Sequence, residues 1–191
     1  MKLVNNNDNA FTGLEAAIVL IAFVVVAAVF SYVVLGAGFF TTQKSQEVVH
    51  TGVQQASSTL EIVGNVYGSA NNAGGVINAV NFTCALAPGG TPVDFEKVVL
   101  TYSNATQLQT LTQGAKGDAA TAGKWTIVAV QNQVTSDSVL ERGEQFDIMA
   151  MPTNGITKND YFTIEVKPSI GAALGITRTG PASIQNVNIL Y

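Results

Sequence analysis

A single glutamate stands at the head of a long uncharged segment. Glu15 directly precedes residues 16–40, a run of 25 residues without Asp, Glu, Lys, Arg or His. Charged side chains in or beside such apolar segments are energetically costly and are usually retained for a function. A carboxylate here can act as the counter-ion of a positive group, or it can lie at a lipid interface near a helix N-terminus.

The other reactive side chains do not form a catalytic set. Cys84 is the only cysteine, which excludes an intramolecular disulfide, and its strand-like context VNFTCALA predicts a small buried side chain. His50 is the only histidine, and we interpret it as a polar position on a helix. P-loop, G-x-S-x-G and H-E-x-x-H motifs are missing, and GAGFFT lacks the third glycine of a dinucleotide fingerprint. The sequence therefore predicts no enzyme and no cofactor.

Two further patterns concern the C-terminal part of the chain. Glu141, Glu144 and Asp147 are close in sequence, but we interpret them as solvated turn residues and expect no metal site. Asn81-Phe-Thr83 and Asn104-Ala-Thr106 match the N-glycosylation triplet. Such triplets also arise by chance, so alone they predict little.

The composition limits the kinds of molecule that the protein is expected to bind. The 191 residues carry a net charge of −4, with 12% charged and 47% hydrophobic residues, and Lys and Arg form no cluster. Nucleic-acid binding is therefore not expected. The apolar residues are concentrated near the N-terminus, and the rest of the chain has the Gly, Thr, Asn and Val content of a β-rich domain.

The uncharged segment predicts a helix that is hydrophobic on all sides. As a helix, 25 residues reach roughly 37 Å, enough for a ~30 Å hydrocarbon core. Such a helix is buried in lipid or in a bundle of like helices. An ordinary secretory signal does not fit, because MKLVNNNDNA has one lysine and one aspartate and no A-x-A site follows the apolar run.

We predict that this helix continues far beyond the apolar segment. A heptad-like stripe of apolar residues follows, and the glycine-rich GSANNAGG then ends the pattern. One long helix is therefore expected over residues 11–70, its second half packing on its own domain rather than forming a free coiled coil. The stripe consists of Val49, Val53, Ala56, Leu60, Val63 and Tyr67.

Residues 71–191 predict a β-sandwich. Seven or eight short runs rich in Val, Ile, Thr and aromatic residues are separated by Gly, Pro, Asn and Asp, as in APGGTP and PTNG. This spacing is typical of an antiparallel, immunoglobulin-like sandwich. The predicted fold class is α+β, a long N-terminal helix followed by this sandwich.

The N-terminus resembles the class III signal of type IV pilin-like proteins. Splitting the chain after Ala10 leaves FTGLEAAIVLIAF, with Phe11 first and Glu15 fifth. The segment GLEAAIVLIAFVVVAAVFSYVVLGAGFF resembles archaeal flagellins, as do ERGEQF, FTIEVKPSIGAAL, ITRTGPASI and NVNILY. Ala10 stands where glycine is usual, which leaves a cut between Asn9 and Ala10 open, and Glu15 is more typical of pilins.

This resemblance implies that the chain is a subunit of a filament and that this filament is rotated for swimming. Residues 1–10 would be a leader removed by a prepilin-type signal peptidase. The helix would span the membrane in the precursor and form the core of an extracellular homopolymer of identical or paralogous subunits. Glu15 would then pair with the new amine of Phe11, and Asn81 and Asn104 become expected glycan sites. An adhesive archaeal pilin, or a membrane-anchored domain that binds solute or performs hydrolysis, remains the alternative.

Overall fold

The structure is a computed structural model that describes residues 7–191, with side chains from Gly13 onward. The chain divides between Thr51 and Gly52 into two compact units. Each unit is described by itself.

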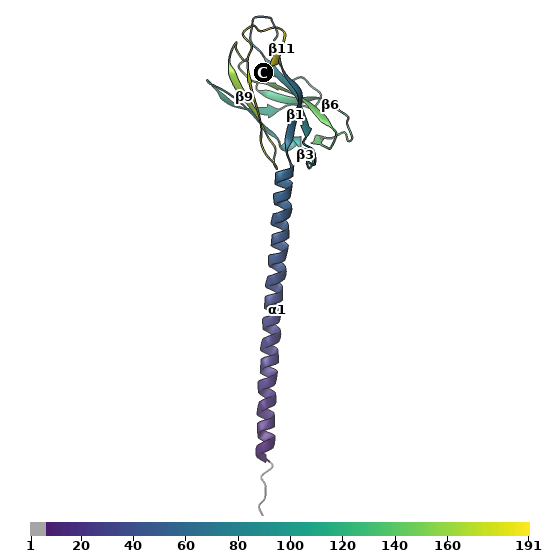
Figure 1. Cartoon of the computed structure of the whole chain (residues 1–191), viewed down its shortest axis with the longest axis vertical. Helices are drawn as coiled ribbons and strands as arrows, with labels where there is room; N and C mark the ends of the chain where they lie inside the picture. The colour runs from purple at the N-terminus through teal and green to yellow at the C-terminus, as the bar shows by residue number, and fades with distance from the viewer. Residues whose placement is uncertain (1–6) are drawn as a thin grey trace, which may run out of the picture. The chain divides into compact units, whose positions relative to one another are not determined.

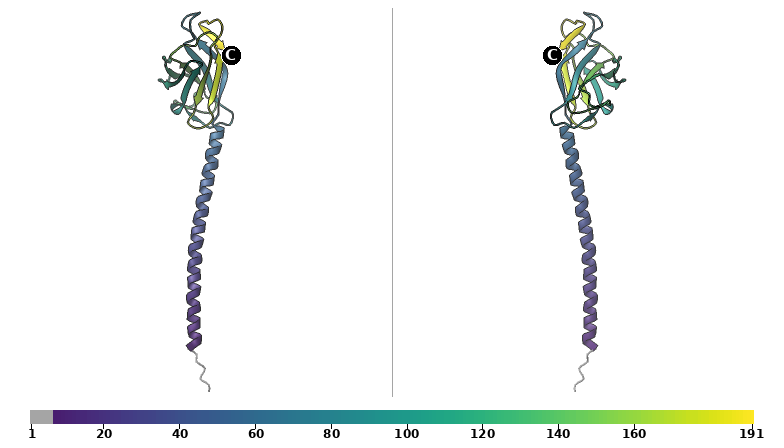
Figure 2. Two further views of the ribbon diagram at one scale, coloured as in Figure 1. Left: turned by 90° about the vertical axis from the view of Figure 1, so that its left-hand side faces the viewer. Right: turned by 90° about the vertical axis from the view of Figure 1, so that its right-hand side faces the viewer.

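The described part of the N-terminal unit is helical throughout, and its helix continues a few residues past the unit boundary. Helix α1 runs from Asn7 to Ser57 and is unbroken in the three ribbon views (Figures 1 and 2). Many of its residues are β-branched, which is a mediocre choice for a helix in water. Helix is nevertheless expected for an apolar segment, because in lipid the backbone must satisfy its own hydrogen bonds.

The predicted end of the helix is wrong. The helix stops at Ser57 rather than near residue 70, and Leu60–Ser69 form strand β1. The Ser58 N–H still makes the helical bond to the Gln54 carbonyl at 2.9 Å, but the Thr59 N–H donates to the Ser57 carbonyl at 2.9 Å, which ends the helical pattern. Beyond it, Leu60 and Val66 are buried in the domain core, and β1 pairs with two other strands. Tertiary pairing therefore overrides the heptad-like stripe.

The C-terminal unit is mostly antiparallel β-sheet, which confirms the predicted fold class. Nine strands hydrogen bond in the order β10-β9-β4-β5-β6-β8-β2-β1-β11, and β3 pairs with β7. The sheet curls so that its two ends come together. The backbone N–H of Thr179, at the end of β10, donates to the carbonyl of Tyr191, next to β11, at 3.0 Å. The remaining bounds are β2 Ala79–Leu86, β3 Val93–Asp94, β4 Val99–Asn104, β5 Leu108–Gln113, β6 Lys124–Gln131, β7 Val139–Leu140, β8 Gln145–Met151, β9 Tyr161–Lys167, β10 Leu174–Thr179 and β11 Val187–Leu190, with a 3-10 turn at Phe95–Lys97.

Two details of the sheet differ from the expectation. Strands β5 and β6 pair in parallel, with Thr112 opposite Lys124 and Gln113 opposite Trp125. The short strand β10 has the sequence LGITRT, which alternates only weakly, so the local pattern does not indicate a strand there. Both features depend on pairing between distant segments rather than on local pattern.

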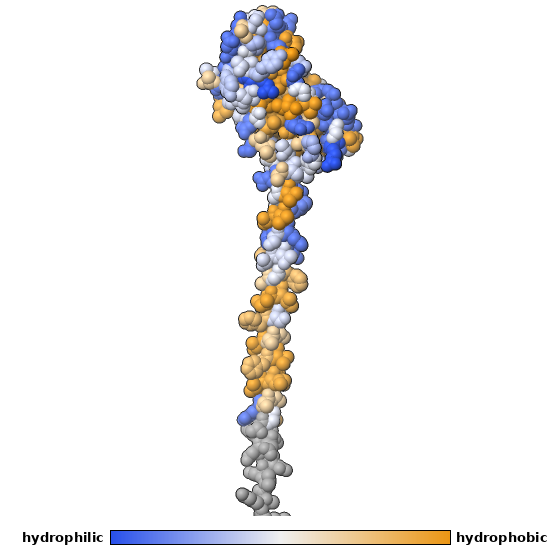
Figure 3. Space-filling model, viewed as in Figure 1, coloured by the Kyte–Doolittle hydropathy of each residue, from blue (hydrophilic) through white to orange (hydrophobic). Residues whose placement is uncertain are grey.

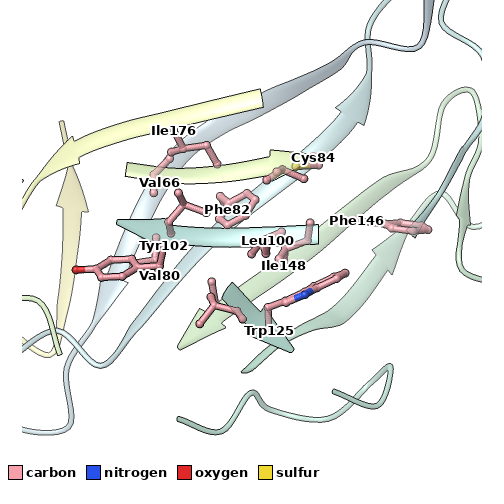
Figure 4. Close-up of a cluster of buried hydrophobic side chains, with 14 of the residues drawn as sticks. Val66, Val80, Phe82, Cys84, Leu100, Tyr102, Trp125, Phe146, Ile148 and Ile176 are labelled. Carbon is pink, nitrogen blue, oxygen red and sulfur yellow. The ribbon is translucent and has the colours of Figure 1, made fainter. Parts of the chain in front are cut away.

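One apolar core lies between the two halves of the curled sheet. Figure 4 shows side chains from β2, β4, β6 and β8 meeting in one cluster. Phe95 contacts Phe146 edge to face with ring centroids 5.0 Å apart, and Trp125 at 6.3 Å. Trp125 is the only tryptophan and is 1% exposed, so its fluorescence reports on this core.

A glycine allows the loop before β10 to approach the start of the domain. The Ala172 N–H donates to the Ser58 carbonyl at 3.3 Å. Gly171 has φ +111°, and a Cβ atom there would lie 1.8 Å from the Ser58 carbonyl oxygen. Only glycine fits this close approach without moving the backbone.

We predict that Gly171→Ala destabilises the β-domain by roughly 1–3 kcal/mol, because it combines an unfavourable φ with a backbone clash. The control is Gly175→Ala in β10, where an added Cβ would meet nothing within 4 Å. Urea unfolding of the full chain in detergent, followed by Trp125 fluorescence, measures both. Equal midpoints for the two variants would contradict the structural role of Gly171.

Candidate functional site

The most unusual surface of the protein is the apolar side of α1. Within the described part of the chain, 16 large hydrophobic side chains between Ile18 and Phe40 are each 53–80% exposed. None of the most apolar stretch is buried, and its length and composition suffice to cross a membrane. Apolar side chains gather along the helix in Figure 3. Soluble monomers rarely expose such a surface, so it marks an interaction site.

Polar groups beyond this surface are satisfied within the helix itself. Thr41 and Thr42 donate their hydroxyls to the carbonyls of Ala37 and Gly38 at 2.8 and 2.9 Å. The ammonium of Lys44 lies 2.6 Å from a carboxylate oxygen of Glu47. Because these groups have partners on their own helix, they can approach an apolar neighbour with less desolvation cost.

The predicted cut lies inside the helix. The backbone is helical from Asn7, so Ala10 and Phe11 belong to α1, and Phe11 precedes Glu15 by one helical turn. The Glu15 side chain is exposed. The spacing of four places Phe11 and Glu15 on the same face of the helix.

The two asparagines of the N-glycosylation triplets occupy different environments. Asn81 lies within β2, half-buried, and donates its amide to the Ser69 hydroxyl at 2.8 Å. Asn104 ends β4 and accepts hydrogen bonds from the backbone N–H groups of Thr106 and Gln107 at 3.0 and 2.8 Å. Asn104 is therefore held in a turn, whereas Asn81 belongs to the centre of a sheet.

The isolated cysteine and histidine lie where the sequence predicted them. Cys84 is fully buried in β2, and burial raises the pKa of its thiol to about 12. His50 is an exposed residue of α1. Among the described residues, no three His, Cys, Asp or Glu side chains form a group that could hold a metal ion.

The interpretation of the acidic set as solvated turn residues is wrong for Asp147 and Glu144. Asp147 lies within β8, half-buried, and accepts a hydrogen bond from the Thr83 hydroxyl. Glu144 is 1% exposed, and its two carboxylate oxygens accept the N–H groups of Val134 and Glu141 at 2.6 and 3.0 Å. Burial acts to raise the pKa of Glu144, but hydrogen bonds from Val134, Glu141 and Thr135 outweigh it and hold the pKa below its usual value. The sequence ERGEQF marks a turn, but nothing local indicates that residues 134–135 fold over the carboxylate.

An uncovered apolar helix joined to a β-sheet domain defines a class of subunits that must bury the helix in lipid or against other copies. A model of archaeal-type flagellin sequences matches residues 10–178. The chain belongs to the archaeal-type flagellin family.

Relatives and a solved structure agree with this assignment. The chain is 44% identical to "Probable flagellin 1" of Archaeoglobus fulgidus over 96% of both chains. It is 38% identical to "Probable flagellin 1" of Aeropyrum pernix over 90% of this chain and 92% of the relative. The solved archaeal flagellum of Methanospirillum hungatei strain JF1 matches with TM-score 0.73 and 37% identity, covering 94% of this chain and 99% of that chain.

The family and the filament structure define the function at a coarse level. The chain is a structural subunit of an archaeal flagellar filament, an extracellular assembly for motility. The recognised family and the filament role predicted from the N-terminal sequence are thereby confirmed.

We predict that Glu144→Gln destabilises the β-domain by about 1–3 kcal/mol, because an amide cannot accept hydrogen bonds on both sides. The folded pKa lies below the unfolded value of about 4.3. This stabilisation is therefore complete above pH 4.3 and is lost as the pH falls through the folded pKa. The difference in unfolding free energy between wild type and Glu144→Gln should therefore shrink as the pH falls through this range.

Urea unfolding at pH 7 and at stepwise lower pH, followed by Trp125 fluorescence, tests this prediction. Glu165→Gln on the exposed side of β9 is the matched control and should change little. A Glu144→Gln midpoint equal to that of the control at pH 7 would show that the buried carboxylate does not hold the loop.

Proposed function

We propose that α1 has two successive roles, as a membrane anchor of the precursor and as a core helix of the filament. It first holds the precursor in the membrane with the β-domain outside. After a prepilin-type signal peptidase removes residues 1–10, α1 leaves the lipid and joins the helices of identical or paralogous subunits in the filament core. A contact that repeats without closing then extends into a helical polymer.

The single observation that carries this proposal is the exposure of the 16 apolar side chains of α1. Each would contribute about 1.5–3 kcal/mol on leaving water, so the helix cannot remain solvated. Transfer from lipid to a protein bundle yields far less, because lipid is already apolar. Close packing must therefore favour the bundle, and Ala27, Ala28, Gly36 and Ala37 permit close approach of neighbouring helices.

The leader is supported by the family match and by the sequence around the cut. The match begins at residue 10, so it leaves out the residues before Ala10. Ala10 is small, and Phe-Thr-Gly-Leu-Glu follows it in the expected register. Cleavage at this point removes the first helical residues of the precursor and leaves a positive amine at the start of the mature helix.

Glu15 provides the counter-charge to that amine. Burying either charge alone in an apolar filament core costs several kcal/mol. The pair can form within one subunit or between neighbours. A pair between neighbours would set the axial register of each incoming subunit and would make assembly depend on cleavage.

We also assign N-linked glycans to Asn81 and Asn104, which would make the filament surface bulky and hydrophilic. Asn104 is supported by its exposed turn, in which Ala105 and Thr106 are accessible. Glycopeptide mass spectrometry of native filaments should find both residues modified. Unmodified asparagines would show that these triplets match the N-glycosylation pattern by chance.

The processing prediction is that the mature chain begins at Phe11. Intact-mass analysis of filaments sheared from cells, together with electron microscopy and a swimming assay of a deletion strain, tests the proposal. Ala10→Leu should block the cut and leave a membrane-bound precursor without filaments, whereas Ala10→Gly should be processed normally. A filament subunit that begins at Met1 would eliminate the leader, and one that begins at Ala10 would move the cut by one residue.

The assembly prediction is that Glu15→Gln leaves cleavage intact but lowers filament yield by about tenfold or more, because an unpaired amine is then buried. Glu15→Asp keeps the charge and should recover part of the yield. Filament mass per cell and the N-terminal peptide are measured for each strain. Processed Glu15→Gln subunits that build normal filaments would show that Glu15 is only an interface residue.

A further inference from the structure

A groove lies on the outer face of the sheet, around Asn81. Its volume is about 260 Å³, just below the roughly 300–1,000 Å³ of sites for drug-sized ligands. Asn81 and Thr83 of β2 line it together with Asp147 and Met149 of β8. A groove of this size suits a ligand of one or two rings.

Irregularities in both flanking strands border the groove. In β1 the pairing moves from Val63 opposite Thr83 to Tyr67 opposite Asn81, so β1 contains extra residues, among them Gly64 with φ +79°. In β6, which pairs with β8, the register also shifts, between Ile127 and Ala129. Bulges bend a strand and re-aim its side chains, and they are frequent beside binding sites. The bulge residues Asn65 and Val128 both line the groove.

We propose that this groove seats the first sugar of the glycan attached to Asn81. The inference rests on the N-glycosylation of Asn81 proposed above and goes beyond it, because it assigns the sugar a binding site on the same chain. Asn81 pairs directly with Tyr67 on one side and with Met149 on the other. A sugar on the Asn81 amide nitrogen is therefore flanked by an aromatic ring and a thioether, with Tyr67 40% exposed.

The lining matches the chemistry of a neutral pyranose. A sugar ring has an apolar C–H face, which suits Tyr67 and Val128, and an edge of hydroxyl groups, which need acceptors and donors. Asp147 accepts from the Thr83 hydroxyl at 2.6 Å and from the Gln131 amide at 2.9 Å. A carboxylate has about four acceptor positions, so it can still accept from sugar hydroxyls.

The charge of the groove argues against an anionic ligand. Neither Lys nor Arg is among the residues that line it, and its single carboxylate would repel a phosphate or sulfate. Asn104 offers a contrast, because it does not line this groove: it ends β4, and its amide nitrogen donates to Asp160 at 3.0 Å beside the exposed Ala105 and Thr106. The two asparagines should therefore differ in how much their glycans stabilise the domain.

The test is a double-mutant cycle between Asn81 and Tyr67 in the native host. Wild type, Asn81→Gln, Tyr67→Leu and the double variant are extracted as full chains in detergent, and thermal unfolding is followed by Trp125 fluorescence. Asn81→Gln should lower the unfolding temperature by about 2–4 °C, and Tyr67→Leu should lower it less in the Asn81→Gln background than in wild type. Tyr67→Phe keeps the ring and should behave as wild type.

Because Asn81 and Tyr67 are cross-strand neighbours, their side chains can couple without a sugar, so the cycle is repeated on chains made in a host without N-glycosylation. The coupling should disappear there, and unchanged coupling would overturn the groove contact. Two further controls separate a sugar contact from a general effect. Asn104→Gln removes the other glycan and should shift unfolding less than Asn81→Gln. Tyr161→Leu, an exposed ring on β9, should have the same effect in both backgrounds. A filament map from cryo-electron microscopy should place sugar density along Tyr67.

Glycopeptide mass spectrometry of each variant distinguishes the two ways of failing. An unmodified Asn81 in wild type overturns the glycan assignment at Asn81 and this inference with it. A modified Asn81 with additive unfolding shifts, or with sugar density pointing away from Tyr67, leaves the glycan assignment intact and overturns only the groove.

Discussion

The apolar surface of α1 is the constraint on which the rest of the protein depends. Sixteen large hydrophobic side chains of α1, each more than half exposed among the described residues, cannot stay in water. The subunit therefore needs an apolar environment, and in the function proposed above this is first lipid and then other copies of itself. Because both environments are apolar, one helix can serve in both, and small differences in packing and in the pairing of a few charges would decide between them.

The β-domain meets the opposite requirement, since it must remain folded in the extracellular medium without disulfides. Its stability comes from one continuous core enclosed by a curled sheet whose end strands meet through Thr179 and Tyr191. Polar groups inside this framework are satisfied individually, and Glu144, which binds the loop around residues 134–135, is the clearest case. The edge strands β10 and β11 each pair with one neighbour only, and both are short, which limits unwanted pairing between crowded subunits.

Irregular backbone positions of the β-domain lie at its close loop contact and beside the groove at Asn81. Gly171 lets a loop reach the first residues after the helix, and the bulge at Gly64 opens the groove beside Asn81. Such positions interrupt regular pairing and weaken the sheet locally. Because strand bulges lie around Asn81, the shape of the surface there is related to the N-glycosylation proposed for this residue.

Features that depend on local composition can be predicted from the sequence alone. The uncharged run after Glu15 predicts a helix in any context, because length and all-round hydrophobicity are properties of one segment, and the burial of Cys84 follows from its strand pattern in the same way. The end of the helix depends instead on tertiary contacts, since Leu60 and Val63 of β1 fit the stripe of a helix equally well. The burial of Glu144, the parallel pairing of β5 and β6, and the groove at Asn81 arise from contacts between segments far apart in sequence. Local periodicity contains no information on such contacts, because they depend on which distant strand lies alongside.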